Sequence, residues 1–120
     1  NESSVKDLAE YLTSHALTGV YVGRVTVQRI ARQVEAPRGF GGRALMLANL
    51  LKSAASYDRL DEAIGLIRRE VLLYQAAWTA ESERHPVSAT WASEWLRRQD
   101  RTLVALEAIQ KAVQAETEVA

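Results

Sequence analysis

Residues 60–78 read LDEAIGLIRREVLLYQAAW, and this stretch decides the fold. Large side chains recur there at alternating steps of four and three residues, at Leu60, Ile64, Ile67, Val71, Tyr74 and Trp78. That spacing places them in one stripe along an α-helix. The pattern continues to about residue 84, where His85-Pro86 ends it because proline cannot continue a helix. The sequence therefore predicts a long helix that begins after Asp58, which we expect to cap it.

A second long helix is expected directly after the proline. Ser88 or Thr90 can cap it, and its stripe contains Trp91, Trp95, Thr102, Leu106, Ile109 and Val113. We expect this helix to end near Ala115. Two long helices joined by a short loop pack side by side in opposite directions, so the sequence predicts an antiparallel helical hairpin.

Three shorter helices are expected before the hairpin, over residues 4–17, 27–35 and 43–56. Gly19 should end the first, Thr26 should cap the second, and Pro37 prevents the second from continuing. The third helix is apolar over most of its circumference, which is typical of a central buried helix. Residues 20–23 are expected to form a turn or a brief extended segment. The glycine-rich loop after Pro37 carries Phe40, whose ring we expect to enter the core.

The predicted fold class is therefore all-α: a five-helix bundle with three short N-terminal helices and a long C-terminal antiparallel helical hairpin. The chain has 120 residues, of which 48% are hydrophobic, so we expect a single helical domain over residues 1–120. Within it, residues 1–57 form a compact basic part and residues 58–116 form the hairpin. Because no initiator methionine is present, we also expect the chain to be part of a larger protein.

Composition excludes several classes of function. There is no cysteine, which excludes a disulfide framework, a thiolate zinc site and a cysteine nucleophile, and is compatible with the cytoplasmic location that we expect. No stretch is apolar enough for a membrane span. No nucleotide-binding or hydrolase motif is present. Glu81 and His85 lie one helical turn apart, but two ligands make a weak metal site. We expect no enzyme, no cofactor and no metal.

Charge is unevenly distributed although 15 basic and 15 acidic residues balance over the whole chain. Residues 20–52 contain six basic residues and one acidic residue, a net charge of +5, whereas residues 1–19 carry −2 and residues 53–120 carry −3. A basic surface of this kind favours a complementary acidic partner or head-to-tail self-association.

The predicted function is protein–protein interaction, as a non-catalytic adaptor module. In an antiparallel hairpin the three tryptophans can gather at the loop end, and tryptophan is enriched among residues that dominate binding energy. The predicted partner-binding residues are the basic set and this aromatic group: Arg29, Arg32, Arg38, Arg43, Trp78, Trp91 and Trp95.

Two other classes of function remain open. The basic segment 24–52 could bind the phosphate backbone of a nucleic acid, although the apolar helix over residues 43–56 is unsuited to lie in a groove. A helical scaffold could instead hold a ligand in a pocket lined by Met46, Leu50, Ile67 and Trp95.

Residues 27–70 resemble bacterial effector-associated, death-like adaptor domains. Arg43-Ala44 and Leu47 fit the Arg-Ala-x-x-Leu helix that follows a glycine-rich turn in that family, and residues 58–63 fit its next turn and helix start. Asp58 stands where the family favours glycine, and Ala63 and Ile64 replace its paired leucines. The resemblance implies a small helical bundle that recruits effectors through contacts between similar domains, as one segment of a larger signalling or conflict protein. It implies no catalytic residue.

Overall fold

The computed structural model describes residues 2–37, 39 and 41–119. These residues form six α-helices and a single 3-10 turn, with no strand among them, which confirms the all-α prediction but not the count of five helices. The elements in chain order are α1 (Glu2–Leu12), α2 (His15–Thr18), α3 (Arg24–Gln33), α4 (Arg43–Ser56), α5 (Leu60–Arg84), η1 (Pro86–Ser88) and α6 (Ala89–Val119). Within the described part of the chain, no helix is long and apolar enough to cross a membrane.

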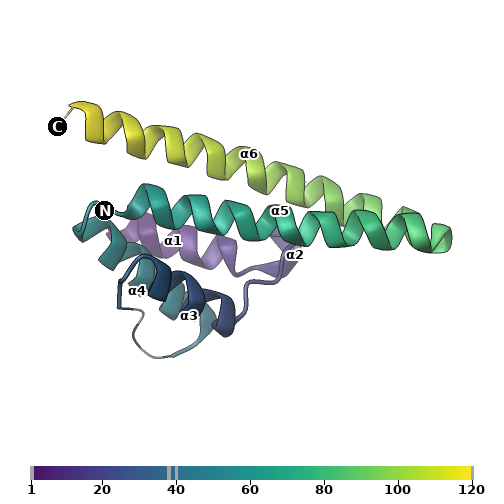
Figure 1. The fold of residues 1–120 in the computed structure, drawn as a ribbon, viewed down its shortest axis with the longest axis horizontal. Coiled ribbons are helices and arrows are strands. Elements are labelled where there is room, and N and C mark those ends of the chain that lie inside the picture. The colour runs from purple at the N-terminus through teal and green to yellow at the C-terminus, as the bar shows by residue number, and fades with distance from the viewer. Residues whose placement is uncertain (1, 38, 40, 120) are drawn as a thin grey trace.

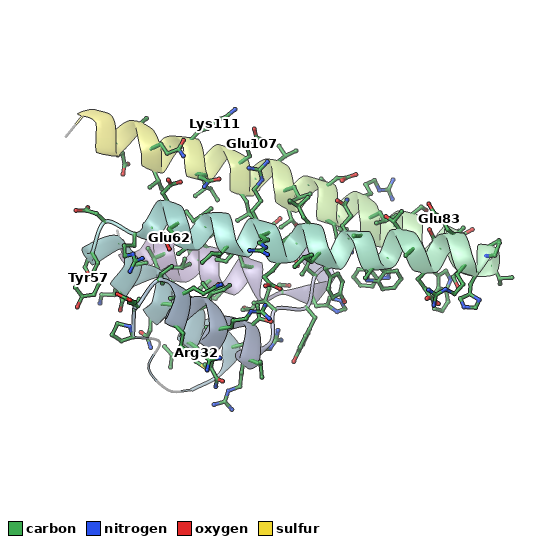
Figure 2. All side chains as sticks on the ribbon, in the orientation of Figure 1. Arg32, Tyr57, Glu62, Glu83, Glu107 and Lys111 are labelled. Carbon is green, nitrogen blue, oxygen red and sulfur yellow. The ribbon has the colours of Figure 1, made fainter. Side chains whose placement is uncertain are left out.

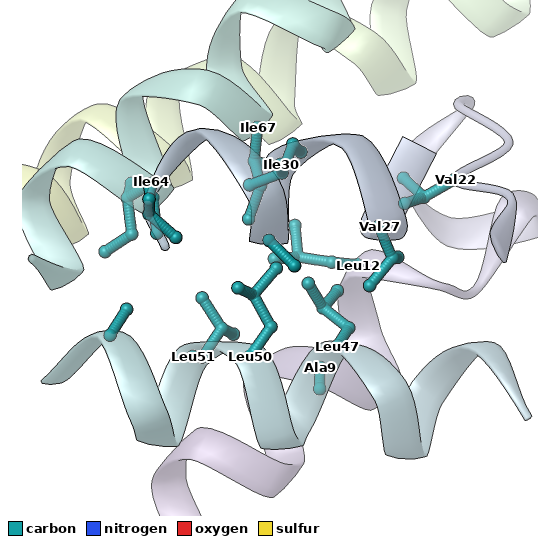
Figure 3. Packing of buried hydrophobic residues seen from close by; sticks show 14 of the residues in the cluster. Ala9, Leu12, Val22, Val27, Ile30, Leu47, Leu50, Leu51, Ile64 and Ile67 are labelled. Carbon is teal, nitrogen blue, oxygen red and sulfur yellow. The ribbon is translucent and has the colours of Figure 1, made fainter. Parts of the chain in front are cut away.

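The core lies where α1, α3 and α4 meet the first half of α5 (Figure 1). Helix α4 supplies the largest share of its side chains, namely Met46, Leu47, Leu50, Leu51 and Ala54. They pack with side chains such as Leu12, Val27, Ile30, Ile64 and Ile67 (Figure 3). The helix expected over residues 43–56 is therefore confirmed, both in its bounds and in its central, buried position.

Helices α5 and α6 run side by side in opposite chain directions, and their far end projects beyond the N-terminal helices (Figure 1). The Gln75 amide donates to Asp100 at 2.6 Å near the middle of the pair, and the Gln114 amide donates to Asp61 at 3.1 Å nearer its base. Of residues 72–98, only Ala92 is buried. We call α1–α4 and the segments that join them the body, and the projecting part of the hairpin the tip.

The first expected helix, over residues 4–17, is wrong because the structure contains two helices there. Ser14 adopts an extended conformation between α1 and α2, and the Thr13 hydroxyl donates to the carbonyl of Ala9 at 2.8 Å. A threonine hydroxyl that binds the preceding turn competes with helix continuation. Leu17, which lies in α2, is exposed. The predicted stop at Gly19 is confirmed, since this glycine caps α2 with a φ of 74°.

Two expected helix caps are also wrong. Helix α3 begins at Arg24 after Gly23, so Thr26 lies inside the helix instead of capping it. Asp58 has a φ of 57° and its N–H donates to Ala55, so it ends α4 and does not begin α5. Aspartate tolerates the left-handed conformation that closes a helix C-terminus. Arg59 occupies the N-cap position of α5.

The segments between and after the helices agree in part with expectation. Residues 20–23 form no regular element, in agreement with a turn or brief extended segment. The break at Pro86 is confirmed by η1, and α6 continues beyond Ala115 to Val119. Phe40 and Arg38 lie outside the described residues.

A buried polar contact attaches α6 to the body. The Gln99 amide donates to the carbonyl of Gly19 at 2.9 Å, and the Thr102 hydroxyl lies 3.0 Å from the carbonyls of both Thr18 and Arg98 and shares its proton between them. Gly19, Thr18, Gln99 and Thr102 are all buried, so these carbonyls have no access to bulk water. We call the hydrogen bonds to Gly19 and Thr18 the clasp. The clasp requires glycine at position 19, because a Cβ atom there would lie 2.7 Å from the carbonyl oxygen of Trp95.

Replacement of Gly19 by alanine should therefore destabilise the protein. The left-handed conformation costs an L-residue about 1–2 kcal/mol, and the clash with a backbone atom adds to it, so we expect a loss of at least about 2 kcal/mol in the free energy of unfolding. Gly42→Ala is the matched control, because Gly42 has a φ of −71° and a Cβ atom added there would meet nothing within 4 Å. We expect the control to change stability by less than about 1 kcal/mol. Urea denaturation followed by circular dichroism measures both, and equal effects would contradict the role of the clasp.

Candidate functional site

A row of stacked side chains lies where the tip leaves the body. The rings of Trp78 and Trp95 stack with centroids 6.3 Å apart, and Trp95 stacks on His15 at 4.8 Å with an angle of 12° between the planes. His15 meets the edge of Tyr21 at 6.1 Å, and the Arg43 guanidinium lies 4.5 Å from the Tyr21 ring centroid. We call these five residues the aromatic row.

Four helices and the irregular segment between α2 and α3 hold the row together, and each position has a local cause. Trp78 of α5 and Trp95 of α6 face each other because the two helices are antiparallel and pack side by side. His15 is held under Trp95 by the clasp, which fixes α2 against α6. Arg43 is held by its hydrogen bond of 3.0 Å to the carbonyl of Val22, next to Tyr21 in the chain. A second guanidinium, that of Arg98, lies 4.7 Å from the Trp95 ring centroid.

The row continues toward the tip as an uncovered surface. Tyr74, Ala77, Trp78 and Glu81 line a shallow hollow of about 270 Å³ on α5. Trp91 lies one turn before Trp95 on α6, so it lies on the same side of that helix, and it is 76% exposed. We call Tyr74, Ala77, Trp78, Glu81 and Trp91 the tip face.

The structure brings together only part of the predicted aromatic group. Trp78 and Trp95 stack on each other, but among the described residues Trp91 has no ring contact with either. Of the three tryptophans that could gather at the loop end, Trp78 and Trp95 come together, and they do so where the tip leaves the body. Trp91 forms the outer part of the tip face instead.

The structure describes three of the four arginines of the predicted basic set, and their surroundings differ. The Arg29 guanidinium pairs with Glu70 of α5, and Arg43 belongs to the aromatic row. Arg32 is exposed on α3, on the side of the body away from α6 (Figure 2). Arg38 lies outside the described residues. Two of these arginines thus contribute to the fold through contacts with other parts of the chain.

Acidic side chains predominate at the end of the tip. Residues 79–94 contain three glutamates and one arginine, a net charge of −2. Glu81 lies 3.5 Å from Nε2 of His85, and Arg97 donates to Glu94. The hydrogen bond from Arg97, followed by the charge of Arg97, lowers the pKa of the Glu94 carboxyl. Glu94 therefore stays ionised at lower pH than an isolated glutamate.

Neither a metal cluster nor the suggested ligand pocket is found among the described residues. These residues contain no group of three metal-ligating side chains. Met46, Leu50 and Ile67 are packed in the core, whereas Trp95 lies in the aromatic row, and the hollows that the structure describes are lined by other residues.

Sequence reasoning missed three residues of this surface: His15, Tyr21 and Arg98. His15 and Tyr21 lie far from the tryptophans in the chain and reach them only because α2 is clasped to α6. Arg98 had a local signal, since it follows Trp95 by three residues on the same side of one helix.

Comparisons of the chain with family models, with curated proteins and with solved structures find no match. The geometry of the aromatic row and the tip face is therefore the basis on which a function can be assigned.

Substitution of Arg43 tests whether this arginine supports the fold. Arg43→Gln removes the hydrogen bond to Val22 and the guanidinium above Tyr21, and we expect it to lower the free energy of unfolding by about 1–2 kcal/mol. Arg32→Gln makes the same chemical change at an exposed position and should cost less than about 0.5 kcal/mol. Thermal and urea unfolding measure the difference. Equal stability of the two variants would mean that Arg43 does not stabilise the fold.

Proposed function

We propose that the protein is a non-catalytic protein–protein interaction module of the adaptor kind, and that it binds its partner through the tip face. In this proposal the chain is one domain in which residues 1–57 anchor a docking arm, the hairpin over residues 58–116. This proposal keeps the five-helix arrangement expected from the sequence, in which the short N-terminal helices form a bundle and the two long helices form a hairpin.

One observation carries the proposal: only Ala92 is buried among residues 72–98, although this stretch includes three tryptophans. Two helices that pack only on each other bury little apolar surface. Most helix stability in proteins comes from such tertiary packing. A contiguous exposed apolar surface on a helical arm is typical of an interaction site. Binding of a partner would bury side chains that the chain itself leaves accessible.

Binding would combine two physical effects. Trp78 and Trp91 offer large, rigid apolar side chains whose burial can dominate the affinity. The guanidinium group of Arg98, at the base of the arm, would attract acidic groups of a partner and orient its approach. The acidic end of the tip would repel the same groups and so fix the direction of docking.

The adaptor role agrees with the resemblance of residues 27–70 to effector-associated, death-like domains. The segment that carries the resemblance includes α4 and the first part of α5, so it lies in and next to the body. The tip face lies beyond this segment, on residues for which the resemblance implies nothing.

Nucleic-acid binding through residues 24–52 is the competing proposal, and the net charge of +5 over residues 20–52 favours it. Arg29 and Arg43, however, already have partners within the chain. Because each phosphate contact requires an available cation, their use inside the fold reduces the contacts that this segment can make with a phosphate backbone.

Site-specific photocross-linking tests the proposed function directly. A photoreactive amino acid replaces Trp91 in one variant and Val104 in the control, which is exposed on the same helix but more than three turns away. In cells that carry the protein naturally, we expect discrete protein adducts at position 91 and few at position 104, because only position 91 lies on the tip face.

Two outcomes would contradict the proposal. Protein adducts of equal yield at both positions, or none at either, would mean that the tip face does not bind a protein. Adducts that nuclease treatment removes would favour the nucleic-acid alternative.

A further inference from the structure

The tip face continues a surface that the body already covers. On α5, Ile67 and Val71 are buried in the core, and Tyr74 and Trp78 follow them at helical spacing on the same side. On α6, Thr102 and Trp95 contact α2, and Trp91 follows one turn later. Both helices thus extend the side that packs against the body past the point where the body ends.

The end of the body next to the tip is also apolar and exposed. Helix α2 and the segment that leads into α3 lie at this end (Figure 1). Leu17, Tyr21 and Val25 are exposed there, each by more than half. We call these three residues, together with Arg24 and Arg43 of the body and Arg98 of the adjoining α6, the wall. The tip face and the wall form an inside corner.

The two sides of this corner carry charges of opposite sign. The wall carries arginines, whereas residues 79–94 at the far end of the tip, which include Glu81, Glu83 and Arg84, carry a net charge of −2. A copy of the chain turned end to end would bring its acidic tip against the basic wall of the first copy. The same rotation would bring the basic wall of the second copy against the acidic tip of the first.

The aromatic residues have the spacing that such a rotation requires. Trp78 is level with Trp95 across the hairpin, so Trp91 is level with about Ser82 of α5. Tyr74 lies four residues from Trp78 toward the body, and the level of Trp91 lies four residues from it toward the tip, about 6 Å in each direction. A two-fold axis at the level of the Trp78–Trp95 stack therefore exchanges the level of Tyr74 with that of Trp91.

We propose that a second copy of this chain occupies the tip face, in an antiparallel two-fold pairing centred on the level of Trp78 and Trp95. Trp91 of each copy then lies at the level of Tyr74 of the other, and the acidic tip of each copy meets the basic wall of the other. This inference rests on the proposed function and names its partner. Other proteins with an apolar surface and acidic groups are alternative occupants; we favour a second copy because it carries both charges at the required ends.

Single introduced cysteines test the geometry, because the chain has no cysteine of its own. Ala77→Cys places a thiol in the tip-face hollow beside the proposed axis, so two copies should be joined by a short thiol-specific cross-linker. Ala76→Cys is the matched control, since Ala76 is exposed but lies on the opposite side of α5 from Trp78. We expect covalent dimers from Ala77→Cys in at least about tenfold higher yield. Similar yields from the two variants would overturn the proposed arrangement.

Charge reversal tests the contact between tip and wall by sedimentation equilibrium. Glu81→Lys with Glu83→Lys gives two basic ends, and Arg24→Glu with Arg98→Glu gives two acidic ends, so each variant alone should dimerise at least about tenfold more weakly. An equal mixture of the two variants should recover dimerisation, because each mixed pair has opposite charges at both contacts. Glu107→Lys with Glu116→Lys is the control for net charge and should leave the dimer unchanged.

The results separate this inference from the proposed function. Weak dimerisation that the mixture does not restore overturns the antiparallel pairing. A wild-type chain that stays monomeric at millimolar concentration also overturns it, and the proposed function then stands only if position 91 still cross-links a different protein. Circular dichroism of each variant distinguishes loss of dimerisation from loss of folding.

Discussion

The clasp between α6 and the turn at the end of α2 is the interaction on which the arrangement of this protein depends. Two buried backbone carbonyls, of Thr18 and Gly19, accept hydrogen bonds from side chains of a helix that lies more than seventy residues later in the chain. A hydrogen bond of this kind contributes about 1 kcal/mol net, but a buried carbonyl left without a donor costs about 1–3 kcal/mol. A position of α6 that breaks the clasp would therefore cost more free energy than the clasp contributes when it forms. This difference favours one position of α6 against the body.

The functional surface follows from that position. Helix α6 contacts the body through α2 and also through Tyr11 of α1, whose hydroxyl lies 3.4 Å from that of Thr102, and the contact with α2 brings His15 against Trp95. His15 and Tyr21 then connect the tryptophans of the hairpin to Arg43 of the body. Beyond the clasp the body contributes no further cover, and the two long helices continue with Trp78 and Trp91 on the uncovered side. The same contact thus creates the aromatic row and sets the point where the tip face begins.

The periodicity of apolar residues predicted the helices that have long apolar stripes. It was less successful at helix ends, where local hydrogen bonds determine the backbone conformation. The bounds of α4 are found as expected from its pattern, and α5 ends at Arg84 as expected from Pro86. The break between α1 and α2 was missed because it has no periodic signal; Ser14 adopts an extended conformation there. Asp58 has the composition of a helix start but serves as a helix end, since both roles suit aspartate.

The candidate site was predictable only in its local parts. The stacking of Trp78 on Trp95 follows from an antiparallel hairpin with a short loop, so the sequence could indicate it. The participation of His15 and Tyr21 depends on a tertiary contact between segments far apart in the chain. The internal partners of Arg29 and Arg43 have the same origin, so a count of charges overestimated the free basic surface.

Amide hydrogen exchange in a Thr102→Val variant tests the role of the clasp most directly. This substitution keeps the shape of the side chain and removes the donor to Thr18. We expect faster exchange in residues 15–19 and in residues 95–106 together, with α3 and α4 protected as in the wild-type chain. Faster exchange confined to α6, or spread evenly over all helices, would contradict the claim that the clasp joins these two segments.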